Sequence, residues 1–301
     1  MLSPDSMPFK TNRQPGSLPR LSGFSLLGFG GPEAGSFLQA QTMNDVRALA
    51  VGQWQWNGWL NPKGRVIALF ALLRPGEDEF LAVLPDFPAS ELLPMLQRFV
   101  FRAKVRLQVV TDLVACADLE PPIDPGIARN GIQGSREAGL RLDFGSDAVR
   151  RHLVLLPESS TLAGQSDPGC DCRWMSQDLA HGLPRLAQGQ RESWTPQMLS
   201  LERLHAFSLK KGCYPGQEIV ARTHYLGQAR RGLSRVVGYG LEPGATLKDG
   251  QANPIGSIIC VAPDGESGLA VLQLDKRPAI ASIDGQQVAL PDFLEGLERP
   301  V

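Results

Sequence analysis

Short runs of apolar residues, some of them alternating with polar ones, fill the first third of the chain. An uninterrupted apolar run is typical of a strand buried on both faces, and alternation is typical of a strand with one buried face. The runs that fit these patterns are residues 24–30, 53–60, 65–73, 79–84 and 104–111. Because residues 75–78 (PGED) favour a turn, the third and fourth runs are predicted to form a hairpin.

Two stretches of the same region have the spacing of amphipathic helices. Residues 33–41 place Phe37 and Leu38 on one side. Further on, apolar residues recur at helical spacing at Leu92, Leu96, Phe99 and Val100. Ser90 is the predicted N-cap of this second helix. Strands on both sides of a helix predict an α+β fold.

The pattern changes near residue 230. Before it, residues 171–181 predict one more helix, and residues 121–134, rich in Pro and Gly, predict a connection between lobes. After it, short β-type runs alternate with turn residues, at 233–239, 255–261, 268–274 and 286–290. Strands at this close spacing predict a small β-barrel.

These patterns divide the 301 residues into three parts. The chain is longer than one typical domain, so several packed units are expected. We expect a loose, proline-containing tail at 1–20, a two-lobed region at 21–229 joined near 121–134, and a barrel at 230–301.

Composition and charge narrow the possible functions. Hydrophobic residues make up 43% and charged residues 20%, as in an ordinary globular protein, and the net charge of −1 argues against a strongly basic nucleic-acid coat protein. Charge is unevenly distributed, however. Residues 201–235 contain seven basic and two acidic residues, a net charge of +5, which leaves −6 for the rest. This window is a candidate site for phosphate, polyglutamate or RNA.

The five cysteines are too few and too scattered for a disulfide framework. Cys170 and Cys172 lack the spacing and the second pair of a zinc or cluster site, so we expect a surface loop there and predict no metal. No signal peptide is recognisable, and the longest strongly apolar run, 66–73, is too short to span a bilayer. The cytoplasm is therefore the expected compartment, without membrane contact.

The segment 208–222, SLKKGCYPGQEIVAR, is the strongest candidate for chemistry. Pro and Gly at its centre predict a type II turn at 214–217, followed by a helix. Cys213 would lie beside Lys210, Lys211 and a helix N-terminus, which favour the thiolate form. The alternative is a tight turn with a small buried cysteine and solvated lysines, and chemistry alone leaves both open.

The string KKGCYxGQExVAR at 210–222 resembles the signature of the YgfZ family, folate-binding relatives of the glycine cleavage T-protein. Two further stretches, FLQAQTMNDV at 37–46 and NPKGR at 61–65, are similar to the family at comparable spacing. The resemblance covers most of residues 21–301. It implies a three-lobed, T-protein-like ring with a central cleft for tetrahydrofolate or a one-carbon derivative.

The resemblance also implies roles for individual residues. Cys213 would be the functional thiol, assisted by Lys211. The expected folate-binding residues are Phe24, Trp174, Asp178, Tyr214, Gln217, Glu218, Arg222, Arg230 and Arg231. The three arginines would bind the carboxylates of the glutamate tail. By contrast, Trp54, Trp56 and Trp59 are predicted to pack in the core from one face of a strand.

Two departures from T-protein-type transferases change the expected activity. The acidic pair of those enzymes is replaced by Ala68 and Leu69, so aminomethyl transfer is not expected. Ala180 stands where the family has a glutamate that leads to the pterin site, and Asp178, two residues earlier, is the candidate substitute.

The resemblance implies a folate-binding accessory protein that supports iron–sulfur cluster maintenance and tRNA modification. Its expected partners are folate and iron–sulfur client enzymes, and direct contact with tRNA remains open. Two alternatives stand beside it. One is a one-carbon transferase that uses tetrahydrofolate, against which the missing acids argue. The other is a module that binds RNA through the basic window at 201–235.

Overall fold

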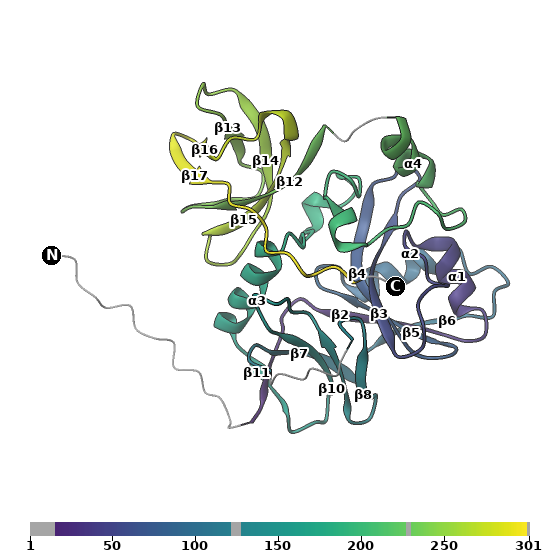
Figure 1. Ribbon diagram of the computed structural model, residues 1–301. Coiled ribbons are helices and arrows are strands. Elements are labelled where there is room, and N and C mark those ends of the chain that lie inside the picture. The colour runs from purple at the N-terminus through teal and green to yellow at the C-terminus, as the bar shows by residue number, and fades with distance from the viewer. Residues whose placement is uncertain (1–15, 122–127, 227–229, 300–301) are drawn as a thin grey trace.

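The computed structural model describes residues 16–121, 128–226 and 230–299, which form three lobes (Figure 1). Two lobes are each built on an open sheet, and the third is a closed barrel. Helices cover or join these sheets without alternating regularly with their strands, so the fold is α+β, as the sequence predicted.

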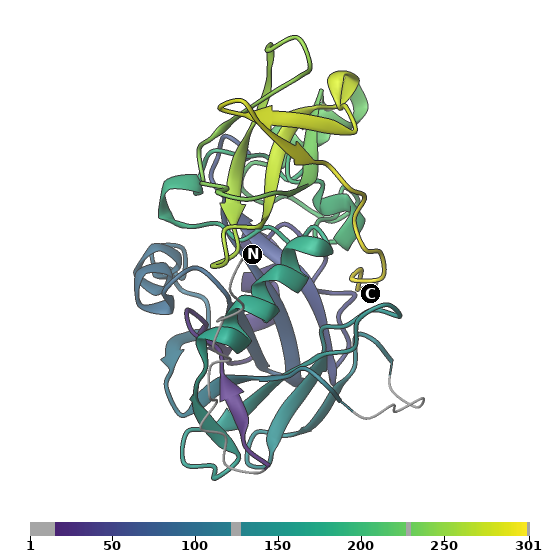
Figure 2. The ribbon, with the colours of Figure 1, turned by 90° about the vertical axis from the view of Figure 1, so that its left-hand side faces the viewer.

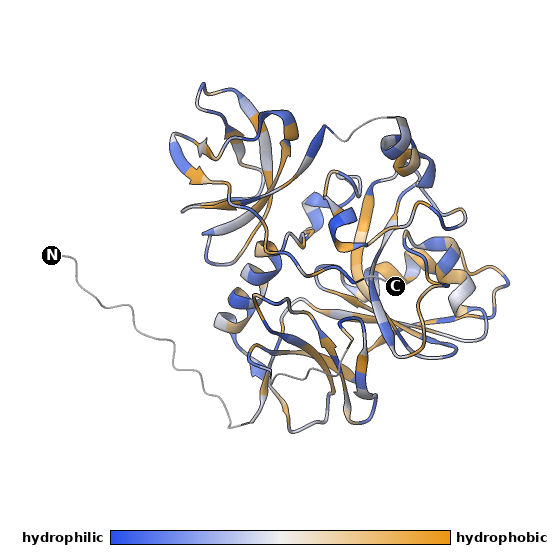
Figure 3. Ribbon diagram, viewed as in Figure 1, coloured by the Kyte–Doolittle hydropathy of each residue, from blue (hydrophilic) through white to orange (hydrophobic). Residues whose placement is uncertain are grey.

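The first lobe contains a five-stranded antiparallel sheet. Its strand order is β3 (Gln53–Leu60), β4 (Val66–Gly76), β5 (Glu79–Leu84), β2 (Ser25–Gly30) and β6 (Arg106–Val110). The helices α1 (Ala34–Gln41) and α2 (Ala89–Gln97) pack on one face, and the other face packs toward the remaining lobes. The first eight residues of β4 are therefore buried on both faces, which explains the apolar run along this strand (Figure 3).

The three tryptophans of β3 are buried, which confirms their predicted core role. They do not share one face, however. Trp54 and Trp56 pack toward the other lobes, and Trp59 packs beneath the helices, because successive residues of a strand point to opposite faces.

The second lobe contains a six-stranded sheet. Its strand order is β11 (Ala163–Ser166), β1 (Leu18–Arg20), β7 (Leu113–Asp118), β10 (His152–Pro157), β9 (Gly139–Asp143) and β8 (Ile132–Ser135). Among the described residues, β1 and β11 pair in parallel and the other neighbouring strands of this sheet pair antiparallel.

The structure of this sheet bears on two of the predicted parts of the chain, the tail at 1–20 and the connection at 121–134. Residues 1–15 of the expected loose tail lie outside the described residues, but Leu18–Arg20 form β1. This strand pairs with β7 and β11, and Arg20 forms an ion pair with Glu158 at 2.8 Å. Within the expected connection at 121–134, residues 122–127 lie outside the described residues. Strand β7 precedes this segment and β8 begins within it, and both belong to one sheet. The chain therefore passes from the first sheet to the second earlier, between β6 and β7.

The third lobe is the closed barrel that the sequence predicted. Its strand order is β12 (Arg231–Val237), β15 (Ser267–Gln273), β14 (Pro254–Val261), β13 (Thr246–Lys248), β16 (Ile280–Ile283) and β17 (Gln286–Ala289). Short 3-10 helices lie at η1 (Gln188–Gln190), η2 (Leu201–Leu204) and η3 (Leu274–Lys276).

The N-terminus of α2 differs from the prediction, because Ser90 is not its N-cap. The helix begins at Ala89, and its first N–H donates to Ser25 Oγ at 2.9 Å. The same hydroxyl donates to the Phe87 carbonyl oxygen at 2.7 Å. The cap is therefore supplied by a neighbouring strand, which no local pattern could indicate.

The helix α3 (Pro168–Ala180) lies between the barrel and the two sheets (Figure 2). Asp167 caps it by accepting from the Gly169 N–H at 2.9 Å, and Pro168 is its first residue. Cys170 and Cys172 therefore lie in the first turns of a helix, and the predicted surface loop is wrong. Cys170 is buried, and Cys172 is half-buried.

The segment 291–299 returns from the barrel to the first two lobes (Figure 1). The Trp56 indole N–H donates to the Leu297 carbonyl oxygen at 2.8 Å. Arg299 is fully buried and donates to the carbonyl oxygens of Asp143 and Gly145. This segment therefore fastens all three lobes together. Within the described ranges, no helix is long and apolar enough to cross a membrane.

Candidate functional site

The motif segment folds as the sequence predicted. The Tyr214 carbonyl oxygen accepts from the Gln217 N–H at 3.2 Å, and Gly216 has φ +79°, which is the geometry of a type II turn. The helix α4 (Gln217–Leu226) follows directly. A Cβ at Gly216 would lie 2.6 Å from the Asn61 carbonyl oxygen, so only glycine fits. The turn at 61–65 is thus packed against the motif.

Lys211 connects the motif to the first lobe. Its side chain is buried, and its ammonium donates to the carbonyl oxygens of Thr42 and Asn44. The ammonium also lies 4.9 Å from the centre of the Tyr214 ring. Burial lowers the pKa of Lys211 to about 8. Lys211 therefore anchors the motif from within, and its charge is not free on the surface beside the thiol.

Cys213 is exposed, which excludes the alternative of a buried cysteine. It lies between Gly212 and the turn, and Lys210 is the exposed lysine of the motif. Tyr214 and Gln217 hold the turn from inside. The Tyr214 hydroxyl donates to the Ser208 carbonyl oxygen at 3.4 Å, and the Gln217 amide donates to the Lys211 carbonyl oxygen at 3.2 Å.

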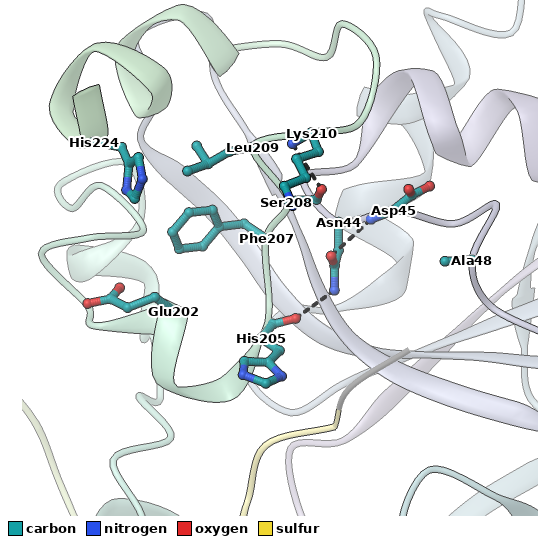
Figure 4. A pocket seen from close by; sticks show the side chains of 10 residues that line it. All are labelled: Asn44, Asp45, Ala48, Glu202, His205, Phe207, Ser208, Leu209, Lys210 and His224. Atoms are coloured by element: carbon teal, nitrogen blue, oxygen red, sulfur yellow. Dashed lines mark hydrogen bonds between the residues drawn. The ribbon is translucent and has the colours of Figure 1, made fainter. Parts of the chain in front are cut away.

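A cavity of about 490 Å³ opens beside this segment (Figure 4). It lies between the loop after α1, the segment that leads into the motif, and α4. Its lining residues are Asn44, Asp45, Ala48, Glu202, His205, Phe207, Ser208, Leu209, Lys210 and His224. Phe207 and Leu209 provide an apolar wall, and polar groups surround it. This composition is typical of a small-molecule site.

The polar side of the cavity is held by a short hydrogen-bond chain. The Asn44 amide donates to the His205 carbonyl oxygen at 2.7 Å, which ties together segments distant in sequence. Asn44 Oδ1 accepts from the Asp45 N–H at 2.9 Å. Burial raises the pKa of Glu202, and the charges of Arg203 and His224 oppose that rise. The Asn44 amide nitrogen also donates to the Trp56 carbonyl oxygen at 2.9 Å, so both of its hydrogens are used within the protein. The cavity thus presents two carboxyl groups and two imidazoles to a ligand.

The structure places Trp174 and Asp178 in the core rather than at this cavity. The Trp174 indole is 1% exposed and lies 4.5 Å from the Arg151 guanidinium. Asp178 is also 1% exposed, and its two carboxylate oxygens lie 2.6 Å from Arg151 and 3.0 Å from Arg185. The Asp178 carboxylate is therefore paired with guanidinium groups inside the core, away from this cavity.

The remaining predicted residues are spread over several surfaces. Phe24 lines a different cavity of about 380 Å³, between the two sheets, and Arg185 lies 5.4 Å from its ring centre. Glu218 and Arg222 form an exposed ion pair at 2.6 Å along α4. Arg230 and Arg231 are exposed at the start of β12.

The sequence reasoning missed most of the cavity. Asn44 and Asp45 lie within the second matching stretch but were given no role there. His205 and His224 flank the motif, a signal that could have indicated a site. No local sequence pattern marked Glu202 as a site residue. Within the described residues, no group of three or more His, Cys, Asp or Glu side chains is placed to hold a metal ion.

Comparison with solved structures defines the type of fold. The fold is similar to that of glycine cleavage system aminomethyltransferase T from Bartonella henselae, with a TM-score of 0.70 and 17% identity, over 91% of this chain and 84% of that one. The three lobes around the motif are therefore a T-protein-type fold.

Sequence comparison defines the family. The chain is 30% identical over 235 residues to the tRNA-modifying protein YgfZ of Vibrio vulnificus strain YJ016, covering 75% of this chain and 71% of that protein. It is 28% identical over 251 residues to the tRNA-modifying protein YgfZ of Edwardsiella ictaluri, covering 75% and 72%. The chain belongs to the YgfZ family. No family-wide sequence model matches it.

Proposed function

We propose that this protein acts in tRNA modification as a folate-binding accessory protein that supports iron–sulfur client enzymes. The tRNA role rests on the name that its relatives share. The observation that carries the folate proposal is the cavity beside the motif. Its volume of about 490 Å³ lies within the usual range of small-ligand sites.

The chemistry of the cavity suits a reduced folate. A pterin is flat and carries amide and amino groups, so it needs an apolar wall and hydrogen-bond partners at its edge. Phe207 and Leu209 supply the wall, and the carboxyl groups of Asp45 and Glu202 supply hydrogen-bond partners for the amide and amino groups. The glutamate tail is anionic, and Lys210 lies at the rim. Arg222, Arg230 and Arg231 are the candidates for a polyglutamate extension.

The proposed role of Cys213 is that of a functional thiol. It is exposed on a turn held by Lys211, Tyr214 and Gln217, so the thiol is presented to a partner without a change of fold. Aminomethyl transfer is not part of the proposal. Ala68 and Leu69 are buried within β4, and neither carries a carboxylate.

Titration of the whole protein with folinic acid, followed by tryptophan fluorescence, tests the folate proposal. We expect a dissociation constant of about 1 μM, which corresponds to about 8 kcal/mol. Phe207→Ala should weaken binding about tenfold or more. Phe101→Ala is the matched control, because Phe101 is 87% exposed and does not line the cavity. Equal affinities in the two variants would place the ligand elsewhere.

The role of Cys213 needs a separate assay. We expect Cys213→Ser to abolish support of an iron–sulfur-dependent tRNA-modifying enzyme in cells that lack the native protein, while folinic acid affinity and the unfolding midpoint stay unchanged. Full support by the variant would contradict the thiol role and leave the folate proposal standing.

A further inference from the structure

The basic residues of the window 201–235 differ in how exposed their charges are in the folded chain. Arg203 forms an ion pair with Glu295 at 3.2 Å, Lys211 is buried, and burial lowers the pKa of Arg235. The exposed cations that remain are Lys210, Arg222, Arg230 and Arg231. They lie before α4, on it, and at the start of β12, so the surplus of exposed positive charge belongs to segments that are neighbours in sequence.

An exposed aromatic residue lies among these cations. Tyr225, near the end of α4, is 68% exposed. The neighbouring His224 ring meets it edge-on, at 4.9 Å between ring centres and 89° between planes. The edge-on contact leaves a face of the tyrosine ring open, so a flat partner can stack there.

The cations are within reach of that ring. Arg222 lies one helical turn before Tyr225 on α4. Three residues separate Leu226 from Arg230, so the two Cα atoms lie within about 14 Å of each other. Glu218 is the acidic residue on this helix. Its pair with Arg222 is exposed on both sides and therefore weak, so Arg222 can exchange that partner for a phosphate.

We propose that α4 and the start of β12 form a face that binds an unpaired stretch of RNA. One base stacks on Tyr225, while Arg222, Arg230 and Arg231 contact the phosphates. Stacking on an exposed aromatic ring combined with cations along the backbone is the general mode of single-strand binding. The choice of RNA rests on the proposed role in tRNA modification.

Two other occupants fit less well. A membrane surface would require a free apolar face on α4, but Val220 of that face is fully buried in the core. A protein partner would favour an interface with an apolar centre and few charges, whereas this face has one tyrosine surrounded by cations.

Fluorescence anisotropy of a labelled, unstructured RNA oligonucleotide and of an unmodified tRNA transcript, measured with the full chain, tests the proposal. We expect Tyr225→Ala to weaken binding about 5- to 150-fold, the range for loss of one stacked base. Tyr225→Trp should retain binding. Tyr239→Ala is the matched control, because Tyr239 is 71% exposed but follows β12 in the barrel lobe.

Salt dependence tests the arginines independently. Binding should weaken steeply with salt, and the double variant Arg230→Gln/Arg231→Gln should reduce the logarithmic salt slope by about 1.4, the effect of two lost single-strand phosphate contacts. Equal affinity of the Tyr225→Ala and Tyr239→Ala variants, or binding that is insensitive to salt, would overturn the RNA face. Unchanged folinic acid affinity in the Tyr225→Ala variant would show that the proposed folate function is unaffected by that failure, because Tyr225 does not line the cavity.

Discussion

The buried centre around Asp178 and the open cavity around Glu202 contain the same kinds of residue, an acid beside aromatic rings. Their surroundings differ. Asp178 is 1% exposed and lies between Arg151 and Arg185, so its charge is fully matched. Within the described part of the chain, no ion pair involves Glu202, and burial raises its pKa. An acid that is ion-paired with buried arginines contributes to the fold. An acid without an ion pair in a cavity is available to a ligand.

The largest expected effect comes from breaking the buried centre. Asp178→Asn removes the charge that pairs with both Arg151 and Arg185. Arg185 keeps its pair with Asp86 at 2.8 Å, whereas buried Arg151 loses its ion-pair partner. We expect a loss of about 3–5 kcal/mol in the free energy of unfolding, measured by urea titration. Glu218→Gln, which breaks an exposed pair, is the control and should cost about 0.5 kcal/mol or less. Similar losses in both variants would contradict the difference between the two regions.

Lys211 gives the second largest effect, as a dependence on pH. Above pH 8 the folded lysine loses its proton, while the unfolded lysine keeps it up to its ordinary pKa of 10.5. The unfolded state then binds more protons, so this lysine's contribution to stability rises with pH between these values, by about 3 kcal/mol at most.

The measurement is the difference in unfolding free energy between the wild type and Lys211→Met, taken at several pH values. This difference removes the opposing titration of Tyr214, whose pKa burial raises to about 12. Lys210→Met is the matched control, because Lys210 is the exposed lysine beside the buried one. If the difference in unfolding free energy between the wild type and Lys211→Met did not change above pH 8, the burial of the Lys211 ammonium would be contradicted.

Glu202→Gln tests the role of the acid in the open cavity. Because burial raises its pKa, the charged form of Glu202 is disfavoured in the folded state. The contribution of Glu202 to stability is therefore lost as pH rises above 4.5, its ordinary value, and the amide should be neutral or slightly stabilising near pH 7. Folinic acid affinity should fall about tenfold, or about 1.4 kcal/mol.

Trp174→Phe is the reverse control for Glu202→Gln. It should lower the free energy of unfolding by about 1–3 kcal/mol, because it removes buried volume, while folinic acid affinity stays unchanged. If Trp174→Phe weakened binding and Glu202→Gln did not, the ligand site would lie at the buried centre.

The smallest effect concerns the thiols. Burial raises the pKa of Cys116 to about 11 and that of Cys260 to about 12, and Cys172 is half-buried with a raised pKa. Exposed Cys213 should therefore react with a brief pulse of iodoacetamide at least about tenfold faster than Cys172. Mass spectrometry of the labelled peptides checks this order, and earlier labelling of Cys172 would contradict it. Bound folinic acid should slow labelling of Cys213 if the thiol faces the ligand.

The sequence was sufficient wherever structure depends on neighbouring residues. The type II turn at 214–217 follows from Pro215 and Gly216, because proline fixes φ at the second position and glycine permits positive φ at the third. The hairpin of β4 and β5 follows in the same way from apolar runs around a turn. The family signature further indicated the T-protein-type fold.

The sequence was insufficient wherever a residue's role depends on distant partners. Asp178 looks like a free acid until the fold brings Arg151 and Arg185 to its two oxygens. The cavity likewise joins Asn44 to His205, which are 161 positions apart. Neither contact leaves a periodic pattern. Aromatic and acidic residues alone therefore did not indicate the cavity beside the motif.

The C-terminal segment also constrains the order of folding. The hydrogen bond from Trp56 to the Leu297 carbonyl joins residues 241 positions apart, so it forms only after nearly the whole chain has been synthesised. Until then Trp54 and Trp56 lack part of their cover, although the sheet that holds them can already pair. We expect the growing chain to expose this apolar surface on the ribosome for most of its synthesis, which makes the first lobe a natural client of chaperones.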